Sequence, residues 1–362
     1  MPTYHELTGD DWSRRMADWQ AWWAGALDRP LITIEAYDPP DDGPNWNEID
    51  DFITRFPLET PVDDVLDFFQ ARLDAIHFYG DAIPKWWPNF GAGIMAGFLG
   101  ARVSYSTRTT WFFPAHDGPL AALEPCYDPD NVWWQRVQAI TRRAVERWQG
   151  RVLVAFTDLG GNLDILASLR GTQQLLLDLY DAPDEVERLT RTLTGLWLRY
   201  YDELYAILSP AQPGTAAWAP PWNPGRGYML QSDFSYMIAP RMFDRYVLPD
   251  LEACCAAMDY AFYHMDGKGQ IPHLDRLLSL PRLRGIQWQP GAGAPLADEW
   301  LHLLARIRDG GKLCQVYVTR EGAHTILREL GGAGFLLDIR EDDRMITPAQ
   351  AEAFLNSIAS LV

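Results

Sequence analysis

Residues 312–339 read KLCQVYVTREGAHTILRELGGAGFLLDI and hold an apolar run, an amphipathic stretch and a second apolar run. The two apolar runs, Lys312–Val318 and Gly334–Ile339, have the length and composition of buried strands. Glu321–Leu330, between them, has the spacing of a helix with one apolar face. A strand, a helix and a strand in this order form a crossover unit with parallel strands. This stretch therefore predicts an α/β fold.

The same alternation continues toward the N-terminus, and helical patterns separate most of the strands. Together with the two runs above, the strand candidates make eight, which favours a (β/α)₈ TIM barrel. No glycine fingerprint follows the first strand, so an open nucleotide-binding sheet is disfavoured. The further strand candidates are Leu31–Tyr37, Ile76–Ile83, Val152–Asp158, Gly214–Pro220, Ala261–Gly267 and Leu283–Gln289.

A chain of 362 residues is long enough for one barrel with insertions, so we expect a single domain over residues 1–362. Within residues 1–30, the spacing of Trp12, Met16, Trp19 and Trp23 predicts a helix laid on the barrel. Residues 85–125 are rich in aromatic residues and glycine, which indicates a long insertion after the second strand. A hairpin is expected in it around Val103–Phe113.

The charge and cysteine content exclude some partners. The chain has 31 Lys and Arg against 49 Asp and Glu, a net charge of −18, which disfavours nucleic acid and anionic membrane. The sequence has no apolar run long enough to predict a membrane span, and the first residues lack a signal-peptide pattern. The four cysteines show no CxxC spacing, which is typical of the reducing cytoplasm. The expected partner is a small molecule, and nothing indicates an oligomeric state.

Several segments, in a consistent order along the chain, resemble one known superfamily. They are Asp28-Arg29-Pro30-Leu31 before the first strand, Gly80–Pro84 near the second, Leu163–Leu179 followed by Tyr180-Asp181-Ala182-Pro183, and His264-Met265-Asp266-Gly267. Together they resemble the uroporphyrinogen decarboxylase superfamily, in the group that holds the decarboxylases and the corrinoid methyltransferases. The resemblance implies a barrel with its active site at the carboxyl ends of the strands.

The resemblance also separates the two branches of the superfamily. The decarboxylases carry an arginine-rich motif after the first strand, whereas this chain has Glu35, Asp38, Asp41 and Asp42 there. Acidic groups repel a polycarboxylate, so uroporphyrinogen is not the expected substrate. The methyltransferase branch, which serves corrinoid proteins or thiol acceptors, implies a corrinoid protein as a partner.

That branch binds zinc through His-x-Cys on one strand and a cysteine near the last strand. His264 matches the histidine, and Asp266 stands where the cysteine is expected. The last strand offers Asp338 and Glu341 instead of a cysteine. The resemblance therefore implies a divalent metal, with zinc as one candidate, held by His264, Asp266 and Asp338 or Glu341. Carboxylates in place of thiolates also suit iron or manganese. Alternatively, Asp266 only orients His264 as a general acid.

Two further acidic residues at strand ends are candidate catalytic groups beside His264. Asp158 ends one strand candidate, where barrel enzymes keep catalytic residues; its alternative is a turn residue. Glu35 ends the first strand and is a candidate general base if aromatic neighbours raise its pKa. The alternative for Glu35 is an ion pair with an arginine.

Polar and aromatic residues at other strand ends are candidates for substrate binding. Glutamine at every second position of a strand in a barrel is typical of hydrogen bonds to a polar ligand, and aromatic walls suit a sugar, a methylated cation or an aromatic ether. Internal hydrogen bonding and packing are the alternatives. The candidates are Trp218, Trp222, Gln287, Trp288, Gln289, Gln315 and Tyr317.

These features support three hypotheses for function. The first is metal-assisted methyl transfer from a small methylated polar substrate. The second is a decarboxylase or lyase that uses Asp158 or Glu35 as an acid or base without a metal. The third is a barrel that binds a small ligand without catalysis.

Overall fold

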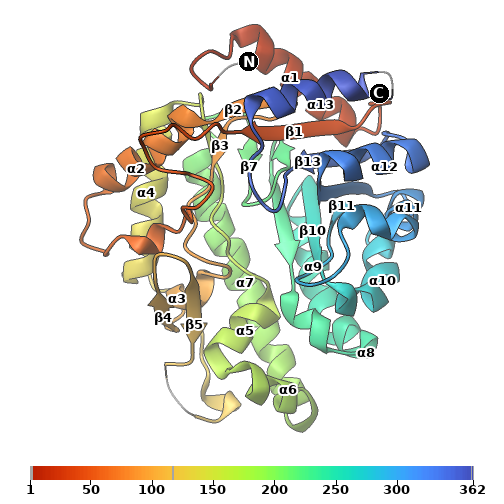
Figure 1. The fold of residues 1–362 in the computed structure, drawn as a ribbon. Helices are drawn as coiled ribbons and strands as arrows, with labels where there is room; N and C mark the ends of the chain where they lie inside the picture. The colour runs from red at the N-terminus through yellow and green to blue at the C-terminus, as the bar shows by residue number, and fades with distance from the viewer. Residues whose placement is uncertain (1–2, 116–117, 360, 362) are drawn as a thin grey trace.

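The computed structural model describes residues 3–115, 118–359 and 361. Figure 1 shows strands and helices alternating along the chain. The strands are β1 (Leu31–Ala36), β2 (His77–Gly80), β3 (Lys85–Trp86), β4 (Arg102–Tyr105), β5 (Thr110–Phe113), β6 (Leu153–Val154), β7 (Thr215–Ala216), β8 (Trp222–Asn223), β9 (Gly227–Gln231), β10 (Tyr260–Asp266), β11 (Leu283–Gln289), β12 (Leu313–Val318) and β13 (Phe335–Ile339).

The helices begin with α1 near the N-terminus and end with α13 near the C-terminus (Figure 1). They are α1 (Gly9–Trp23), α2 (Val62–Ala75), α3 (Met95–Phe98), α4 (Val132–Trp148), α5 (Asn162–Arg170), α6 (Thr172–Asp181), α7 (Pro183–Leu208), α8 (Pro240–Met242), α9 (Leu248–Ala256), α10 (Leu274–Ser279), α11 (Leu301–Asp309), α12 (Arg320–Leu330) and α13 (Pro348–Ile358). Within the described ranges, no helix combines the length and apolar composition needed to cross a membrane.

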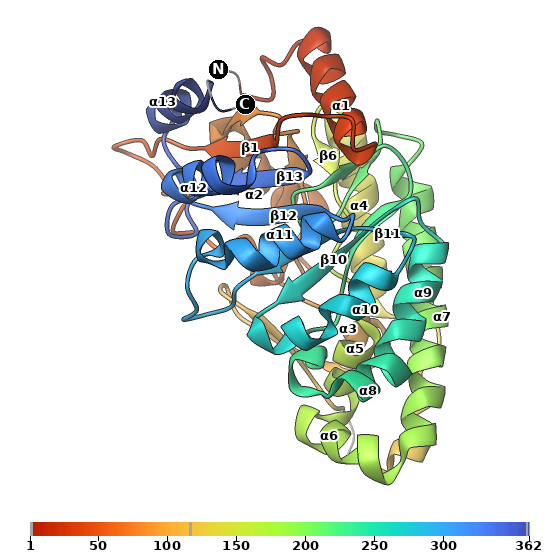
Figure 2. The same cartoon turned by 90° about the vertical axis from the view of Figure 1, so that its right-hand side faces the viewer.

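The centre of the fold is a seven-stranded sheet in the order β2-β1-β13-β12-β11-β10-β9. All its pairs are parallel except β1 with β2. Figure 2 shows α10, α11 and α12 lying along one face of this sheet, as right-handed crossovers between parallel strands require. The α/β class and the parallel sheet that residues 312–339 predict are therefore confirmed.

Three short two-stranded sheets accompany the large one. β3 pairs in parallel with β6, and the backbone N–H of Phe156 donates to the carbonyl of Ala216 at the end of β7. β7 pairs in antiparallel fashion with β8. β4 and β5 form an antiparallel hairpin, which confirms the hairpin expected around Val103–Phe113.

Two details of the predicted strand set are wrong. The candidate at Ile76–Ile83 contains β2, which runs antiparallel to β1 and is not a parallel barrel strand. Only Ile76 separates α2 from β2, so the chain enters β2 beside the carboxyl end of β1, with His77 opposite Ala36. A parallel strand would need a connection back to the amino end of β1. The second detail is β9, which the predicted set omits and which pairs with β10.

The N-terminal helix α1 confirms the predicted helix and joins distant strands. Its buried indole N–H groups donate to backbone carbonyls: Trp19 to Asp81 at 2.8 Å, Trp22 to Phe335 at 3.1 Å and Trp23 to Trp222 at 2.8 Å. These acceptors lie next to β2, on β13 and on β8. A buried indole N–H needs a partner, so these bonds fix where the helix docks.

The segment between α1 and β1 is fixed by a buried carboxylate. Asp81 receives two hydrogen bonds from the Arg29 guanidinium, at 2.8 and 2.9 Å, and one from the backbone N–H of Ile32 at 2.9 Å. Arg29 also contacts Asp18 of α1 at 2.9 Å. The Asp28-Arg29-Pro30-Leu31 segment thus holds α1, β1 and the end of β2 together.

We expect Asp81→Ala to lower the free energy of unfolding by about 2 kcal/mol, because it leaves a half-buried guanidinium and the Ile32 N–H without their acceptor. Asp18→Ala is the matched control. It removes a more exposed partner of the same arginine and is expected to cost less than about 1 kcal/mol. Urea denaturation of the two variants measures the difference. Equal losses would contradict the central role of Asp81.

Candidate metal centre

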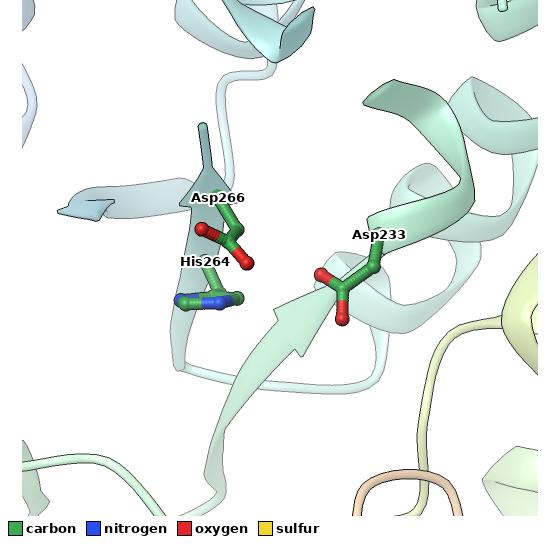
Figure 3. A group of neighbouring side chains, drawn as sticks. All are labelled: Asp233, His264 and Asp266. Carbon is green, nitrogen blue, oxygen red and sulfur yellow. The ribbon is translucent and has the colours of Figure 1, made fainter. Parts of the chain in front are cut away.

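Two neighbouring strands bring an imidazole and two carboxylates together. His264 and Asp266 are two residues apart on β10, so their side chains leave the same face of the strand. Asp233 begins the short helix Asp233–Met237 just after β9. Gln231 of β9 pairs with His264, so Asp233 comes level with Asp266. One ligand atom from each lies within 4.8 Å of the others, and Figure 3 shows the two carboxylates facing each other.

The position of Asp233 is set by another carboxylate. Asp164, near the start of α5, accepts hydrogen bonds from the backbone N–H groups of Asp233 at 3.0 Å and Phe234 at 2.7 Å. These N–H groups are unpaired donors at the start of a helix, and an acidic group there is favourable. Asp164 is therefore a positioning residue for Asp233.

The end of β10 is fixed by Gly267. This residue has φ +79°, and a Cβ atom on it would lie 2.9 Å from the ring of Tyr236. Its N–H donates to the carbonyl of Gln289 at 2.7 Å. Only glycine adopts this conformation without strain in so little space, so the glycine after Asp266 is required for the turn that ends the strand.

The His264 ring is held by glutamine side chains. Gln287 on β11 donates its amide N–H to Gln315 Oε1 on β12, and its own oxygen is hydrogen-bonded to His264 Nδ1. Because that oxygen can only accept, Nδ1 carries the proton, and Nε2 keeps a free lone pair. Burial lowers the pKa of His264, which favours the neutral ring. A neutral imidazole with a free Nε2 is the form that binds metals.

The surroundings of the cluster suit a cation. Burial and the nearby Asp266 raise the pKa of Asp233, so the carboxylates repel each other in a poorly solvated place. Beside Asp233, Gln231 Oε1 and Ser232 Oγ are buried and have no hydrogen-bond partner within the described part of the chain. Buried oxygen atoms normally have a partner. A divalent ion with its bound water would neutralise the charge and occupy these oxygens, so the residues present fit a metal.

The other two predicted ligands have different partners. Asp338 on β13 accepts hydrogen bonds from Thr33 at 2.8 Å and Arg340 at 2.7 Å. Glu341 accepts from Arg320 at 2.9 Å. The structure thus brings together His264 and Asp266 from the predicted set, and it adds Asp233, which the sequence analysis missed.

A cavity of about 890 Å³ lies at the carboxyl ends of the strands. Glu35 of β1 lies in its wall, as do Lys85 and Trp86 of β3, Trp218, Tyr317 of β12 and Asp338. Burial and Asp338 raise the pKa of Glu35, while burial lowers the pKa of Lys85 to about 8. Lys85 is thus a group that can exchange a proton near pH 8, and Glu35 holds its proton more tightly than an exposed carboxyl does.

Trp218 connects this cavity to the metal centre. Its ring lines the cavity and lies edge-on to the His264 ring, with 5.0 Å between ring centroids. Its buried N–H has no partner among the described residues. Gln289 lies opposite Asp266 in the strand register, and Arg340 lies over the Tyr317 ring at 4.2 Å. Trp218 therefore touches both the cavity and the cluster, whereas Tyr317 lines the cavity and Gln289 lies beside the cluster.

Two of the candidate substrate-binding residues have internal partners instead. Trp288 points to the opposite side of β11 from Gln287, is fully buried and packs against Trp300 with 5.2 Å between ring centroids. Trp222 is buried on β8 and donates its indole N–H to the carbonyl of Pro213 at 2.8 Å.

Two other buried carboxyl groups have raised pKa values. Burial raises the pKa of Asp158 to about 7, and its Oδ1 accepts from the Gly160 N–H at 2.8 Å, as in a turn. Burial also raises the pKa of Asp250 on α9 to about 7, and Thr194 donates to it at 2.5 Å. Both groups hold a proton more tightly in the folded chain than in the unfolded one.

We expect Gln287→Leu to weaken metal binding about 10–100-fold, because His264 loses the acceptor that keeps Nε2 unprotonated. Gln289→Leu is the matched control on the same strand and should bind metal like the wild type. Competition with a chromophoric zinc chelator measures both affinities. Equal effects of the two changes would mean that Gln287 does not orient the ring.

The raised pKa of Asp250 predicts a pH-dependent effect on stability. A carboxyl whose pKa is raised by folding stabilises the fold below its ordinary pKa, about 4, and this contribution is lost as the pH rises to about 7. Asp250→Asn should therefore be more stable than the wild type by roughly 1–3 kcal/mol at pH about 8. At pH about 4 the two should be similar.

Urea denaturation across this pH range measures the difference. Glu252→Gln, an exposed change on the same helix, is the control and should show no such trend. A constant difference between Asp250→Asn and the wild type at all pH values would contradict the raised pKa.

Comparison with known proteins gives a likeness in fold. No family model matches the chain, and no curated protein matches its sequence. A solved methyltransferase from Methanosarcina mazei has a TM-score of 0.53 at 11% identity, over 76% of this chain and 80% of that one. A B12-independent methionine synthase from Shewanella sp. W3-18-1, in complex with selenomethionine, is less similar, with a TM-score of 0.37 at 12% identity over 73% of each chain. In its fold the chain is thus similar to a solved methyltransferase.

Proposed function

We propose that this chain is an enzyme that binds a divalent metal at Asp233, His264 and Asp266 and transfers a methyl group from a small polar substrate. The observation that carries the proposal is the cluster itself, whose ligand atoms lie within 4.8 Å of one another. The fold likeness to a methyltransferase agrees with this reaction class.

Each residue of the centre has a defined part in the proposal. The metal, when bound, acts as a Lewis acid on the heteroatom that carries the methyl group. Asp233 and Asp266 neutralise the ion, and His264 supplies a neutral nitrogen ligand. Gln287 keeps that nitrogen unprotonated through its hydrogen bond to Nδ1. Three protein ligands leave a position for the substrate. Because carboxylates make the centre hard, an oxygen or nitrogen leaving group is favoured over sulfur.

The cavity beside the centre is the proposed substrate site. Trp218 is the proposed wall against the methylated group, since it lines the cavity and also contacts the His264 ring. Gln289, Gln315 and Tyr317 are the proposed polar contacts. Of these, Gln315 is buried and its amide nitrogen lacks a partner among the described residues, which supports a role in binding.

The architecture and setting of the enzyme are part of the same proposal. We infer that β3, β6 and β7 complete a closed barrel with the large sheet, because Glu35 and Tyr317 of that sheet and Lys85 of β3 line one cavity. The chain would then be one barrel domain, with residues 1–30 as its N-terminal segment and residues 85–125 as its insertion, except that β3 at the start of this range belongs to the barrel. A cytoplasmic location and a corrinoid protein as methyl acceptor complete the proposal.

A second candidate function is a metal-independent decarboxylase or lyase. The observation that favours it is Glu35, a cavity residue with a raised pKa, near Lys85, whose pKa is lowered to about 8. Such a pair can supply and remove a proton near neutral pH. Asp158 is the alternative acid or base for this reaction, although it does not line the cavity described above.

We expect protein purified without chelator or affinity-tag metal to hold about one divalent ion per chain by elemental analysis. Asp233→Asn and His264→Ala should remove the ion, because each takes away a ligand. Asp338→Asn should retain it, because Asp338 is bonded to Thr33 and Arg340. The loaded protein should release methyl groups from methyl ethers or methylamines to cob(I)alamin.

The outcomes separate the candidates. Loss of the ion in Asp338→Asn but not in Asp233→Asn would move the centre to the last strand. Full activity of a metal-free preparation would favour the acid–base enzyme, and Glu35→Gln should then abolish turnover. A protein that binds ligands but shows no turnover in any variant would be a binding barrel.

A further inference from the structure

The cavity beside the candidate metal centre contains cations that form no ion pair with a carboxylate of the described residues. Arg55, Arg72 and Lys85 line it and are half-buried. The chain as a whole carries a net charge of −18, so partners of opposite sign are plentiful elsewhere on its surface. In such an acidic protein, cations that line a cavity indicate that the cavity needs positive charge for what it binds.

Each of these three cations is held by a backbone carbonyl. Arg55 donates to the carbonyl of Asp50 at 3.1 Å, Arg72 to that of Ile49 at 3.4 Å, and Lys85 to that of Ala219. Among the described residues, none of the three has a carboxylate within 4.0 Å. Their remaining N–H groups are available to a ligand.

Two other cations of the same cavity have carboxylate partners, and a third, Arg344, is exposed to solvent. Arg340 contacts Asp338 at 2.7 Å, and Arg108 contacts Asp50 at 3.5 Å. The cavity also contains acids that could in principle serve the three unpaired cations: Glu35, Glu48, Asp51 and Asp343.

None of these acids forms an ion pair with the three cations. Glu48 and Asp343 are exposed to solvent, which screens them. Asp51 accepts a hydrogen bond from the Asn89 amide at 2.6 Å. Glu35 is half-buried, and burial and Asp338 raise its pKa. Within the described part of the chain, Arg55, Arg72 and Lys85 therefore lack the close ion pairs that Arg108 and Arg340 make.

The geometry points to an anionic substrate: a small methylated molecule whose carboxylate binds between Arg55, Arg72 and Lys85. Guanidinium and ammonium groups in a partly desolvated cavity bind carboxylates through strong charge-assisted hydrogen bonds. Trp218, which lines the same cavity and contacts His264, places the other end of the molecule toward the metal centre. The part of the inference that concerns the methylated end rests on the proposed methyl transfer. The part that concerns the carboxylate rests on the three cations alone.

A matched pair of probes tests this inference. 4-Methoxybenzoate and 4-methoxybenzyl alcohol share the ring and the methyl ether and differ in the carboxylate. We expect the wild-type protein to bind the carboxylate at least about tenfold more tightly by calorimetry. Arg72→Gln and Lys85→Gln should each reduce this preference, and the double variant should abolish it. Arg72→Lys keeps the charge and should retain part of the preference.

Arg142→Gln is the matched control, since it removes one positive charge from an exposed position on α4, outside the cavity. It should leave the preference unchanged. Thermal melting checks that each variant is folded. Equal binding of the two probes, binding of neither at about 10 mM, or a preference that survives in the double variant would overturn the inference.

The same experiment distinguishes this inference from the proposed function. Asp233→Asn should lose the metal and still prefer the carboxylate probe. Arg72→Gln and Lys85→Gln should keep the metal. If the wild-type chain prefers the carboxylate probe but binds no metal, the result would support the anion site and contradict only the proposed metal centre.

Discussion

Side chains alternate across a strand, and this alternation, together with the register of the parallel sheet, determines the site. On β10 it sends His264 and Asp266 to one side, and on β11 it sends Gln287 to the same side and Trp288 to the helices. A shift of one residue on either strand would exchange these sets. The apolar packing of the outer face therefore holds the polar groups of the inner face in place.

Polar contacts then run from strand to strand around the inner face. His264 contacts Gln287, Gln287 contacts Gln315, and the Tyr317 ring lies under the Arg340 guanidinium, which is bonded to Asp338. These contacts extend from the metal centre to the wall of the cavity that holds Glu35 and Lys85. Networks of this kind fix side-chain orientation only when all members are satisfied. The atoms that are not satisfied, on Trp218 and Gln315, lie where a substrate is expected.

The sequence predicted the α/β class, the sheet from β10 to β13, the N-terminal helix, and His264 and Asp266 of the cluster that they form with Asp233. These features follow from hydrophobic periodicity and from a recognisable segment around His264. Asp233 was not predicted as a site residue because β9 was not predicted as a strand. The apolar run Tyr228–Leu230 is only three residues long and does not alternate with polar residues, so it is too short to indicate a buried strand. Without that strand nothing marks Asp233 as a strand-end residue. The direction of β2 depended on a one-residue connection, and the hydrogen bond from Thr33 to Asp338 depended on the pairing of β1 with β13.

The docking of α1 has a consequence for biosynthesis. Trp22 donates to the carbonyl of Phe335, 313 residues further along the chain. At a translation rate of about 5–20 residues per second, the ribosome needs roughly 15–60 s to make that acceptor after the helix has emerged. During this time the indole of Trp22 lacks the acceptor that it has in the folded chain, whereas the acceptor of Trp19, the carbonyl of Asp81, has already been made. The helix α1 can therefore reach its final packing only near the end of synthesis, when β13 is available.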